Sequence, residues 1–422
     1  MPAIESTRAA TRWITRTVPL FLATAVGYAT YVVVARVCFS NLIASLNETK
    51  AAVAILVLYF VFLLLMIGTY ARTLYNASFN PGVVPLGPRA VERQRAKREP
   101  RKWHSYGEGD IEGRAYEAGP DNSLPSPGLE DFYSRDAFVC ESDGRPKWCS
   151  ECCNWKQDRV HHSRDIGRCI YKMDHYCPWV GGMIGEKSFK FFVQFTSYAT
   201  LYCAVVLGST SYAIRRQIER GANPDPYFLA AVVIAAFFEL FSFLMTVTSM
   251  RYILLNMTNV DILASGQKYY QLAVRVPRGT RSERFGVIVY PLTRPEYSPS
   301  DRKRRVTVLN PNSHTPEEQP LDTIPVTSRD DLASRTFAIL ETNQGENPWD
   351  LGPWRNWLSV MGTNPLDWLL PIRHSPCVNH ESHESLYPMD RVLDQIRSRY
   401  GLSPGPPSDE SVIMEMRGLQ GL

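Results

Sequence analysis

A short polar stretch in the second quarter of this 422-residue chain holds the side chains best suited to covalent chemistry. Residues 174–177 read Asp-His-Tyr-Cys. A cysteine is nucleophilic as its thiolate, and a free thiol needs a nearby base or a lowered pKa to reach that form near neutral pH. His175 can supply the base, and Asp174 can orient the imidazole and stabilise its charged form. The pattern indicates acyl transfer through a thioester on Cys177.

A group of metal-ligand side chains precedes this tetrapeptide. Cys149 and Cys152 form a C-x2-C pair, the usual opening of a structural zinc site, and His162 and Cys169 offer a third and a fourth ligand. Free buried thiols beside a core histidine are the alternative, which four ligand types at these spacings make the weaker interpretation. A disulfide framework is not indicated, because thiols on the cytosolic side of a membrane stay reduced.

The apolar residues are concentrated in four blocks, although 45% hydrophobic residues and a mean hydropathy of −0.20 would also suit a soluble protein. Each block is long enough for a helix to cross about 30 Å of hydrocarbon. Burial in a soluble core is the alternative, but nothing else in the chain could cover four such segments. The first block is longer than a typical signal-peptide core, so we expect it to be retained. We predict transmembrane helices over residues 18–35, 51–70, 191–214 and 227–250.

Basic residues predict the orientation of these helices. They gather after the second and after the fourth block, and the positive-inside rule places both segments, and hence both termini, in the cytosol. The loop between the third and fourth blocks disagrees, because its Arg215, Arg216 and Arg220 would be lumenal. The net charge of +4 and the basic run 302–305 suit membrane flanks and a solvated tail better than nucleic-acid binding.

Residues 148–195 resemble, in register, the cysteine-rich domain of the DHHC protein S-acyltransferases (palmitoyltransferases), in the fungal variant whose signature reads DHYC. Three shorter segments match other landmarks of that family. Asn80-Pro81-Gly82 stands where the family usually has Asp-Pro-Gly, and residues 258–261 (Thr-Asn-Val-Asp) stand where it has Thr-Thr-x-Glu. Residues 347–362 resemble the C-terminal motif that packs the tail onto the transmembrane bundle, with Asn356 as the packing residue. An amphipathic interfacial helix is the alternative for that aromatic-rich stretch.

We therefore expect an all-α polytopic membrane protein, with four transmembrane helices and a cytosolic, zinc-bound cysteine-rich domain. Residues 86–135 and much of 268–340 have the polar, Pro-rich composition of loosely packed chain. The expected layout is a cytosolic N-terminus at 1–17, transmembrane helices 1 and 2 at 18–72, a flexible basic cytosolic segment at 73–147, the DHYC domain at 148–190, transmembrane helices 3 and 4 at 191–255, and a cytosolic tail at 256–422 with the packing motif at 347–362.

The family normally carries a second zinc site, whose four positions are occupied here by Ser163, Ile166, Tyr176 and Met183. None is a good zinc ligand, and all four have changed together. A partial set would leave polar groups buried, whereas Ile, Met and Tyr offer packing in place of the metal. By this resemblance Tyr176 replaces a zinc ligand and not the catalytic base, so the chemistry is kept and one zinc is expected. The family's Asn-Asn is Gly181-Gly182 here, which could loosen the turn.

The resemblance assigns Cys177, His175 and Asp174 as the catalytic residues. It implies an enzyme that loads palmitate from palmitoyl-CoA onto Cys177 and passes it to cysteines of membrane-associated or cytosolic-face proteins. The acyl chain should lie among the helices, since exposing each methylene to water costs about 0.8 kcal/mol. Candidates for lining its cavity are Trp179, Phe195, Tyr198 and Tyr202, although each could be ordinary helix packing. Candidates for contacts with the CoA phosphates are Lys156, Arg159 and Lys172, for which solvated surface charge is an equal alternative.

Two other classes of protein compete with the acyltransferase hypothesis. A non-catalytic adaptor could use the cysteine-rich module to bind membrane proteins. A RING-type ubiquitin ligase would need eight metal ligands in an interleaved pattern, and this chain offers about half of them. The expected location is a fungal plasma membrane, vacuole or Golgi membrane, with the lipid bilayer as a partner and no nucleic acid. The intramembrane carboxylate of Glu239 has no role that the sequence reveals.

Overall fold

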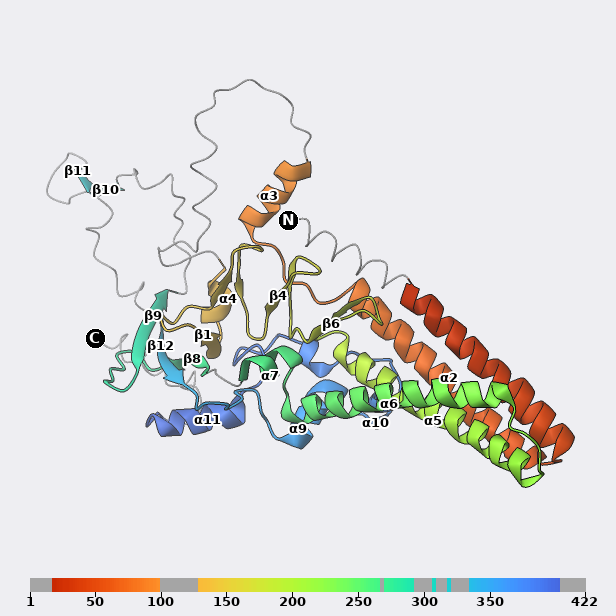
Figure 1. Cartoon of the computed structure of the whole chain (residues 1–422). Coiled ribbons are helices and arrows are strands. Elements are labelled where there is room, and N and C mark those ends of the chain that lie inside the picture. Colours follow the sequence, from red (N-terminus) through yellow and green to blue (C-terminus); the bar gives the residue numbers. More distant parts are fainter. Residues whose placement is uncertain are drawn as a thin grey trace, which may run out of the picture.

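The computed structural model of the chain describes residues 17–98, 128–265, 269–291, 306–308, 317–319 and 334–402. Long helices form an elongated bundle at one end, and shorter helices and strands form the other end (Figure 1). We call the described part outside the four long helices the head. The head contains the whole cysteine-rich region and the described tail.

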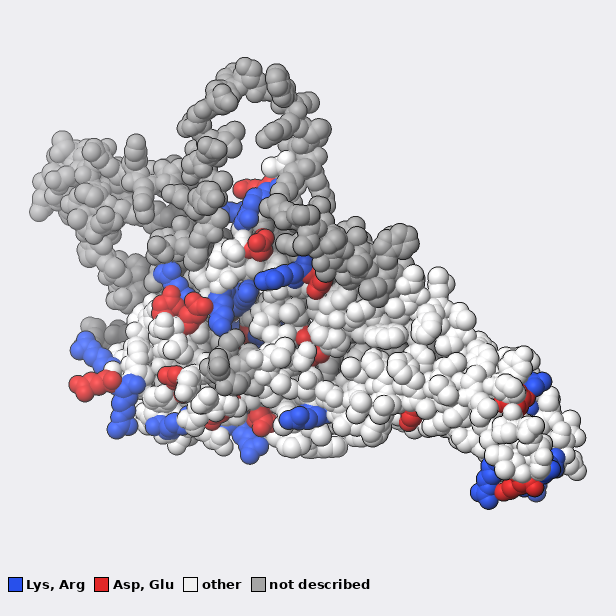
Figure 2. Space-filling view, viewed as in Figure 1, with Lys and Arg blue, Asp and Glu red and all other residues white. Residues whose placement is uncertain are grey.

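Four helices are long and apolar enough to cross a membrane, which fits a multi-pass membrane protein. At 1.5 Å per residue, each exceeds the roughly 30 Å of a hydrocarbon core. Their middle sections present a mostly uncharged surface (Figure 2). Each helix covers one predicted block and extends beyond it. They are Thr17–Ser45, whose second part is the π-helical η1 (Tyr31–Ser45), α2 (Thr49–Ser78), α5 (Phe189–Glu219) and α6 (Pro226–Leu255).

Ion pairs tie the helices together at the end far from the head. Asp225 caps α6 by accepting a hydrogen bond from the backbone N–H of Tyr227 at 2.9 Å, and it pairs with Arg36 of η1 at 2.5 Å. Arg216 of α5 pairs with Glu48, at the start of α2, at 2.7 Å. The basic loop that disagreed with the predicted orientation is thus engaged with neighbouring acids. The orientation itself stays a prediction.

The head contains a four-stranded antiparallel sheet in the order β1-β8-β12-β9, so the all-α expectation is wrong for this part of the chain. One face of the sheet packs against α11 (Asp390–Arg399), where Leu272 and Val274 contact Val392 and Ile396. The other face packs against α4 (Glu130–Tyr133). The strands are β1 (Ala137–Cys140), β8 (Gln271–Val276), β9 (Gly286–Pro291) and β12 (Ser334–Glu341).

The sheet joins segments that the sequence had marked as loosely packed. Strand β1 lies in the expected flexible segment 73–147, and β8 pairs with both β1 and β12. Each strand is short and pairs with strands far along the chain, so no local sequence pattern predicted the sheet. The remaining elements of the described tail are α7 (Asn259–Ser265), β10 (Val306–Val308), β11 (Glu317–Gln319), α9 (Pro353–Met361), α10 (Pro365–Leu369) and η4 (Pro376–Val378).

The cysteine-rich region folds as three two-stranded hairpins. Chain that the sequence predicted to be flexible wraps around the first two: the N–H of Val84 donates to the carbonyl of Cys169, and that of Gly87 to the carbonyl of Cys152, both at 2.9 Å. Helix α3 (Pro88–Arg98) follows, and residues 99–127 lie outside the described part of the chain. The hairpins pair β2 (Lys147–Cys149) with β3 (Asn154–Lys156), β4 (His161–Ser163) with β5 (Arg168–Ile170), and β6 (His175–Cys177) with β7 (Gly182–Ile184).

Candidate active site

The four residues predicted as zinc ligands come together in the structure. Cys149 and Cys152 lie at the β2-β3 turn, and His162 lies directly opposite Cys169 across β4 and β5. The four ligand atoms lie within 4.8 Å of one another, and the His162 Nδ1 atom is 3.3 to 3.9 Å from the three sulfurs. Ligands about 2.0–2.3 Å from a tetrahedral zinc ion would have similar separations. This donor set fits a structural zinc ion.

Two neighbouring residues of ligand type are excluded from this group. His161 and Cys153 are absent from the set of side chains that could share a metal. The thiol of Cys153 donates to the carbonyl of Ser150 at 3.3 Å and accepts a hydrogen bond from Arg93 of α3. It therefore fastens α3 to the first hairpin.

The third hairpin carries the predicted catalytic residues. Nδ1 of His175 is 2.6 Å from a carboxylate oxygen of the buried Asp174, and His175 also forms a hydrogen bond with Cys177. Burial alone would lower the pKa of His175, but the hydrogen bonds to Asp174 and Cys177 outweigh it and raise the pKa to about 9. The site thus stabilises the imidazolium that forms when His175 takes a proton from the buried Cys177 thiol.

The carboxylate of Asp174 is held from a second side. Its Oδ1 atom accepts a hydrogen bond from the backbone N–H of Asn259 at 2.8 Å, and its own N–H donates to the carbonyl of Ile184 at 2.9 Å. Asn259 begins α7, inside the Thr-Asn-Val-Asp segment that resembles a family landmark. The role of Asn259 belongs to its backbone, so its side-chain type gave no signal for it.

The β6-β7 turn rests on the end of α2. Gly181 adopts a φ of +64° and closes the turn by donating to the carbonyl of Pro178 at 3.2 Å. A Cβ atom on Gly182 would lie 2.4 Å from the carbonyl oxygen of Ala77 in α2, so a glycine is needed for this approach. The hydroxyl of Tyr70 donates to the carbonyl of Trp179 at 3.1 Å. The two glycines therefore fit a tightly seated turn, and the expectation that they loosen it is wrong.

Two of the three candidates for CoA phosphate contacts are buried and engaged. The Arg159 side chain is 1% exposed and pairs with Asp261 at 2.5 Å, while Nζ of Lys172 donates to the side chain of Asn256 at 3.0 Å. Burial opposes ionisation of Asp261, but Arg159 outweighs it and lowers the pKa of that carboxyl. Both cations join the cysteine-rich region to the end of α6, which leaves neither side chain free to contact a CoA phosphate. Lys156, which is half-buried, stays a candidate.

An apolar cavity of about 500 Å³ opens among the four long helices, within the ~300–1,000 Å³ range of small-molecule sites. Trp179, Phe195 and Tyr202 line it, as predicted candidates, together with Tyr70. Trp179, Phe195 and Tyr70 also pack in the cluster around Cys177, so the cavity adjoins the thiol.

One of the predicted cavity residues lies elsewhere. Tyr198 is absent from the lining, and its hydroxyl donates instead to the carbonyl of Leu369 in the tail at 2.7 Å. The hydroxyl of Tyr202, by contrast, lies 2.9 Å from the hydroxyl of Tyr59 on α2. Tyr198 therefore joins the tail to α5.

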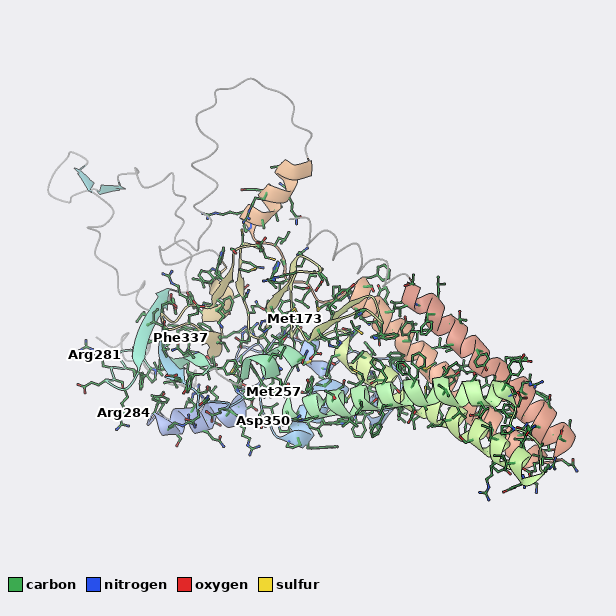
Figure 3. The ribbon with its side chains drawn as sticks, viewed as in Figure 1. Met173, Met257, Arg281, Arg284, Phe337 and Asp350 are labelled. Carbon is green, nitrogen blue, oxygen red and sulfur yellow. The ribbon has the colours of Figure 1, made fainter. Side chains whose placement is uncertain are left out.

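Asn356 ties the tail to the bundle, as the packing motif predicted. Its buried amide donates to the carbonyl of Leu254, in the last turn of α6, at 2.8 Å and to Asp350 at 2.7 Å. Its oxygen accepts from the N–H of Leu351 at 2.9 Å. Asp350 and the nearby Met257 mark the place where α6 meets the tail (Figure 3).

Comparison with known proteins reveals clear relatives. Residues 142–265 match the model of the DHHC palmitoyltransferase family. Over 94% of its length this chain is 34% identical to palmitoyltransferase pfa5 of Aspergillus fumigatus, with 92% of that protein covered. It is 35% identical to palmitoyltransferase pfa5 of Emericella nidulans, over 92% of this chain and 86% of the relative. Palmitoyltransferase PFA3 of Saccharomyces cerevisiae is 27% identical over 60% of this chain and 58% of its own length.

Proposed function

Because the chain belongs to the DHHC palmitoyltransferase family and is a protein S-palmitoyltransferase, we propose that Cys177, His175 and Asp174 carry its reaction. The observation that supports this most directly is their arrangement: a buried thiol contacts a carboxylate-oriented imidazole beside an apolar cavity. The fungal relatives are named palmitoyltransferases, which makes palmitoyl-CoA the expected acyl donor.

In the first half-reaction, His175 removes the proton of Cys177, and the thiolate attacks the thioester carbonyl of palmitoyl-CoA. A new C–S bond forms to Cys177 and the C–S bond to CoA breaks. His175 then returns the proton to the departing CoA thiolate. Asp174 keeps the imidazole in the productive orientation in both steps, because its hydrogen bond to Nδ1 leaves the other ring nitrogen for proton transfer.

The acyl chain lies in the cavity bordered by Trp179, Phe195 and Tyr202. Its apolar lining removes the chain from water, worth about 0.8 kcal/mol per methylene, while the carbonyl stays beside Cys177. In the second half-reaction the cysteine thiol of a membrane-associated protein gives its proton to His175, and its sulfur attacks the same carbonyl. A C–S bond forms to that cysteine, the C–S bond to Cys177 breaks, and His175 returns the proton to Cys177. Lys156 is the remaining candidate for a CoA phosphate contact.

One zinc ion held by Cys149, Cys152, His162 and Cys169 would supply structure to the head and no chemistry at the thioester. The N- and C-termini and the head face the cytosol in this proposal, as the basic residues after the second and fourth helices predict. That side also holds palmitoyl-CoA and the reduced cysteines of substrate proteins. The plasma membrane, the vacuole and the Golgi remain the candidate locations.

Labelled palmitoyl-CoA tests whether Cys177 is the nucleophile among the nine cysteines. The purified wild-type protein should acquire a label that hydroxylamine removes, and Cys177→Ser should lose it because a neutral imidazole activates a hydroxyl poorly. Cys203→Ser is a matched control, since that thiol lines the cavity but contacts neither His175 nor Asp174 in the described hydrogen bonds. Wild-type labelling of Cys177→Ser would refute the proposed role.

A further inference from the structure

A buried lysine at the start of α5, Lys190, has no role in the proposed reaction. Lys190 is 1% exposed, and its ammonium group has no hydrogen-bond partner among the described residues. A buried, unpaired charge costs stability unless something compensates it. An ionisable side chain where a helix enters a membrane indicates a functional site by default. No described residue of opposite charge forms a hydrogen bond with Lys190. Its position therefore suits an anionic ligand from outside the chain.

Other cations converge on the same place. Arg72, near the end of α2, lies 3.4 Å from the ring of His374 in the tail, and its Nε atom is buried without a hydrogen-bond partner. The ring of Phe191 packs near both, 5.2 Å from the Arg72 guanidinium and 5.3 Å from the His374 ring. Burial, followed by the positive charge of Arg72, lowers the pKa of His374. Lys187 and Lys190 also act electrostatically on this imidazole.

The negative charge available at this cluster is small. Lys190 lies within electrostatic reach of Asp367 and Arg373, and Asp367 is 3.9 Å from Arg373 in a loose ion pair. The other hydrogen-bonding group nearby, Gln194, uses its amide nitrogen on the backbone carbonyls of Asp367 and Trp368, both at 3.0 Å. Among the described side chains that act on Lys190, Asp367 is the one carboxylate, so with Arg373, and with Arg72 beside His374, the cluster has an excess of positive charge.

An exposed apolar surface borders the cluster. Leu366, Leu369 and Ile372 of the tail are 60%, 57% and 62% exposed. The same segment lies along α5, because Tyr198, nine residues after the start of that helix, donates to the carbonyl of Leu369. At 1.5 Å per residue this contact lies roughly 13 Å along the helix, so the exposed leucines lie further toward the transmembrane bundle than Lys190 does. Apolar side chains in such a position meet lipid.

We propose that Arg72, Lys190 and Arg373 bind the phosphate of an anionic glycerophospholipid in the leaflet beside the head, with its acyl chains against Leu366, Leu369 and Ile372. The charges match a headgroup phosphate, and the apolar surface matches the chains below it. The lipid holds the tail segment 365–374 against α2 and α5. The CoA phosphates offer similar chemistry, but only a membrane lipid also covers the exposed leucines and Ile372.

The test uses full-length protein in bilayer nanodiscs made of phosphatidylcholine alone or with phosphatidic acid. Native mass spectrometry measures retained anionic lipid, and a titration of palmitoyl-CoA gives kcat and KM. The wild-type protein should retain phosphatidic acid, and Arg373→Gln should weaken retention about fivefold, the effect of one cation near an anionic lipid. Lys190→Met should weaken it at least as much, with KM for palmitoyl-CoA unchanged in pure phosphatidylcholine.

Two variants keep the test decisive. Arg373 is 72% exposed, so Arg373→Gln should fold even if the buried Lys190→Met does not. Arg284 is an exposed cation at the far end of the head, and Arg284→Gln should retain lipid like the wild-type protein (Figure 3). Equal retention by the wild-type, Arg373→Gln and Arg284→Gln proteins would overturn the proposal. So would a raised KM for palmitoyl-CoA with unchanged lipid retention, which would assign the cluster to the CoA phosphates.

Discussion

The second and third hairpins of the cysteine-rich region are held in place by different means. The β4-β5 hairpin supplies His162 and Cys169 to a compact set of four metal ligands. The β6-β7 hairpin, which carries Cys177, instead touches the backbone of α2 through Gly182 and is fastened to α7 through Asp174. The β6-β7 hairpin is therefore positioned by docking onto a membrane helix, and none of its residues belongs to the candidate metal group of the described chain.

The contact between the β6-β7 hairpin and α2 matters for catalysis. A hairpin held only by zinc would move with the head, whereas β6-β7 contacts α2, which also borders the apolar cavity through Tyr70. The thiol of Cys177 is thereby held beside the apolar cavity. Metal ligation and catalytic positioning are then separable, and substitutions should affect them independently.

Removing one ligand should produce the largest effect. Cys149→Ser should lose the metal and unfold the first two hairpins, because structural zinc contributes roughly 10–16 kcal/mol of apparent binding energy. Elemental analysis should find about one zinc per wild-type chain and far less in the variant. Cys153→Ser is the matched control, since this neighbouring thiol lies outside the ligand set and should leave the metal in place. Two zinc ions per wild-type chain would contradict the idea that the second site has been replaced.

His175→Ala should leave the metal content unchanged and slow autoacylation, because general-base assistance typically contributes about 10²–10⁴-fold. Single-turnover labelling with excess enzyme measures the autoacylation rate, and elemental analysis measures the zinc content of the variant and the wild-type protein. An unchanged rate would remove His175 from the mechanism.

The same variant predicts a change in pH dependence. The folded-state pKa of His175 is raised to about 9, above its ordinary value near 6.5. Its contribution to stability is therefore fully present below about pH 6.5 and is lost as the pH rises through about 9. Thermal denaturation of the wild-type protein should show this loss between these pH values. His175→Ala should show less of it, and equal profiles would contradict the raised pKa.

Gly182→Ala should disturb the docking of the β6-β7 hairpin on α2 without disturbing the metal ligands. The added methyl would lie 2.4 Å from the carbonyl oxygen of Ala77, and relieving such a clash typically costs about 1–3 kcal/mol. The hairpin should shift away from α2, lowering the autoacylation rate by about tenfold or more, with zinc retained. Gly167→Ala is a control, because a Cβ there meets nothing within 4 Å, although its φ of +69° adds backbone strain. If Gly182→Ala kept full activity, docking on α2 would not position Cys177.

The sequence was sufficient for the parts of the site that depend on spacing. The four-helix bundle followed from the length of its apolar blocks, and the candidate metal ligands and Cys177 from their order in the cysteine-rich region. Contacts between distant segments were not predictable in this way. Nothing near Arg159 indicates its burial against Asp261, and strand β1 pairs with β8, more than a hundred residues further along the chain. Tyr198 was placed wrongly because its helical spacing does not say which neighbour it faces.

The smallest effect should come from Tyr176, the residue expected to stand in place of a zinc ligand. Tyr176 pairs directly with Met183 across β6 and β7, next to Cys177 but outside the candidate metal group. Tyr176→Phe keeps the ring and removes one hydroxyl, whose hydrogen bond would contribute about 0.5–1.5 kcal/mol. Autoacylation should therefore fall by no more than about tenfold, zinc content should stay constant, and any loss should appear in thermal stability. Tyr176→His should gain no metal, because Ser163, Ile166 and Met183 supply no further ligands. A second zinc ion in Tyr176→His, or complete loss of labelling in Tyr176→Phe, would show that metal and catalysis are not separated in this hairpin.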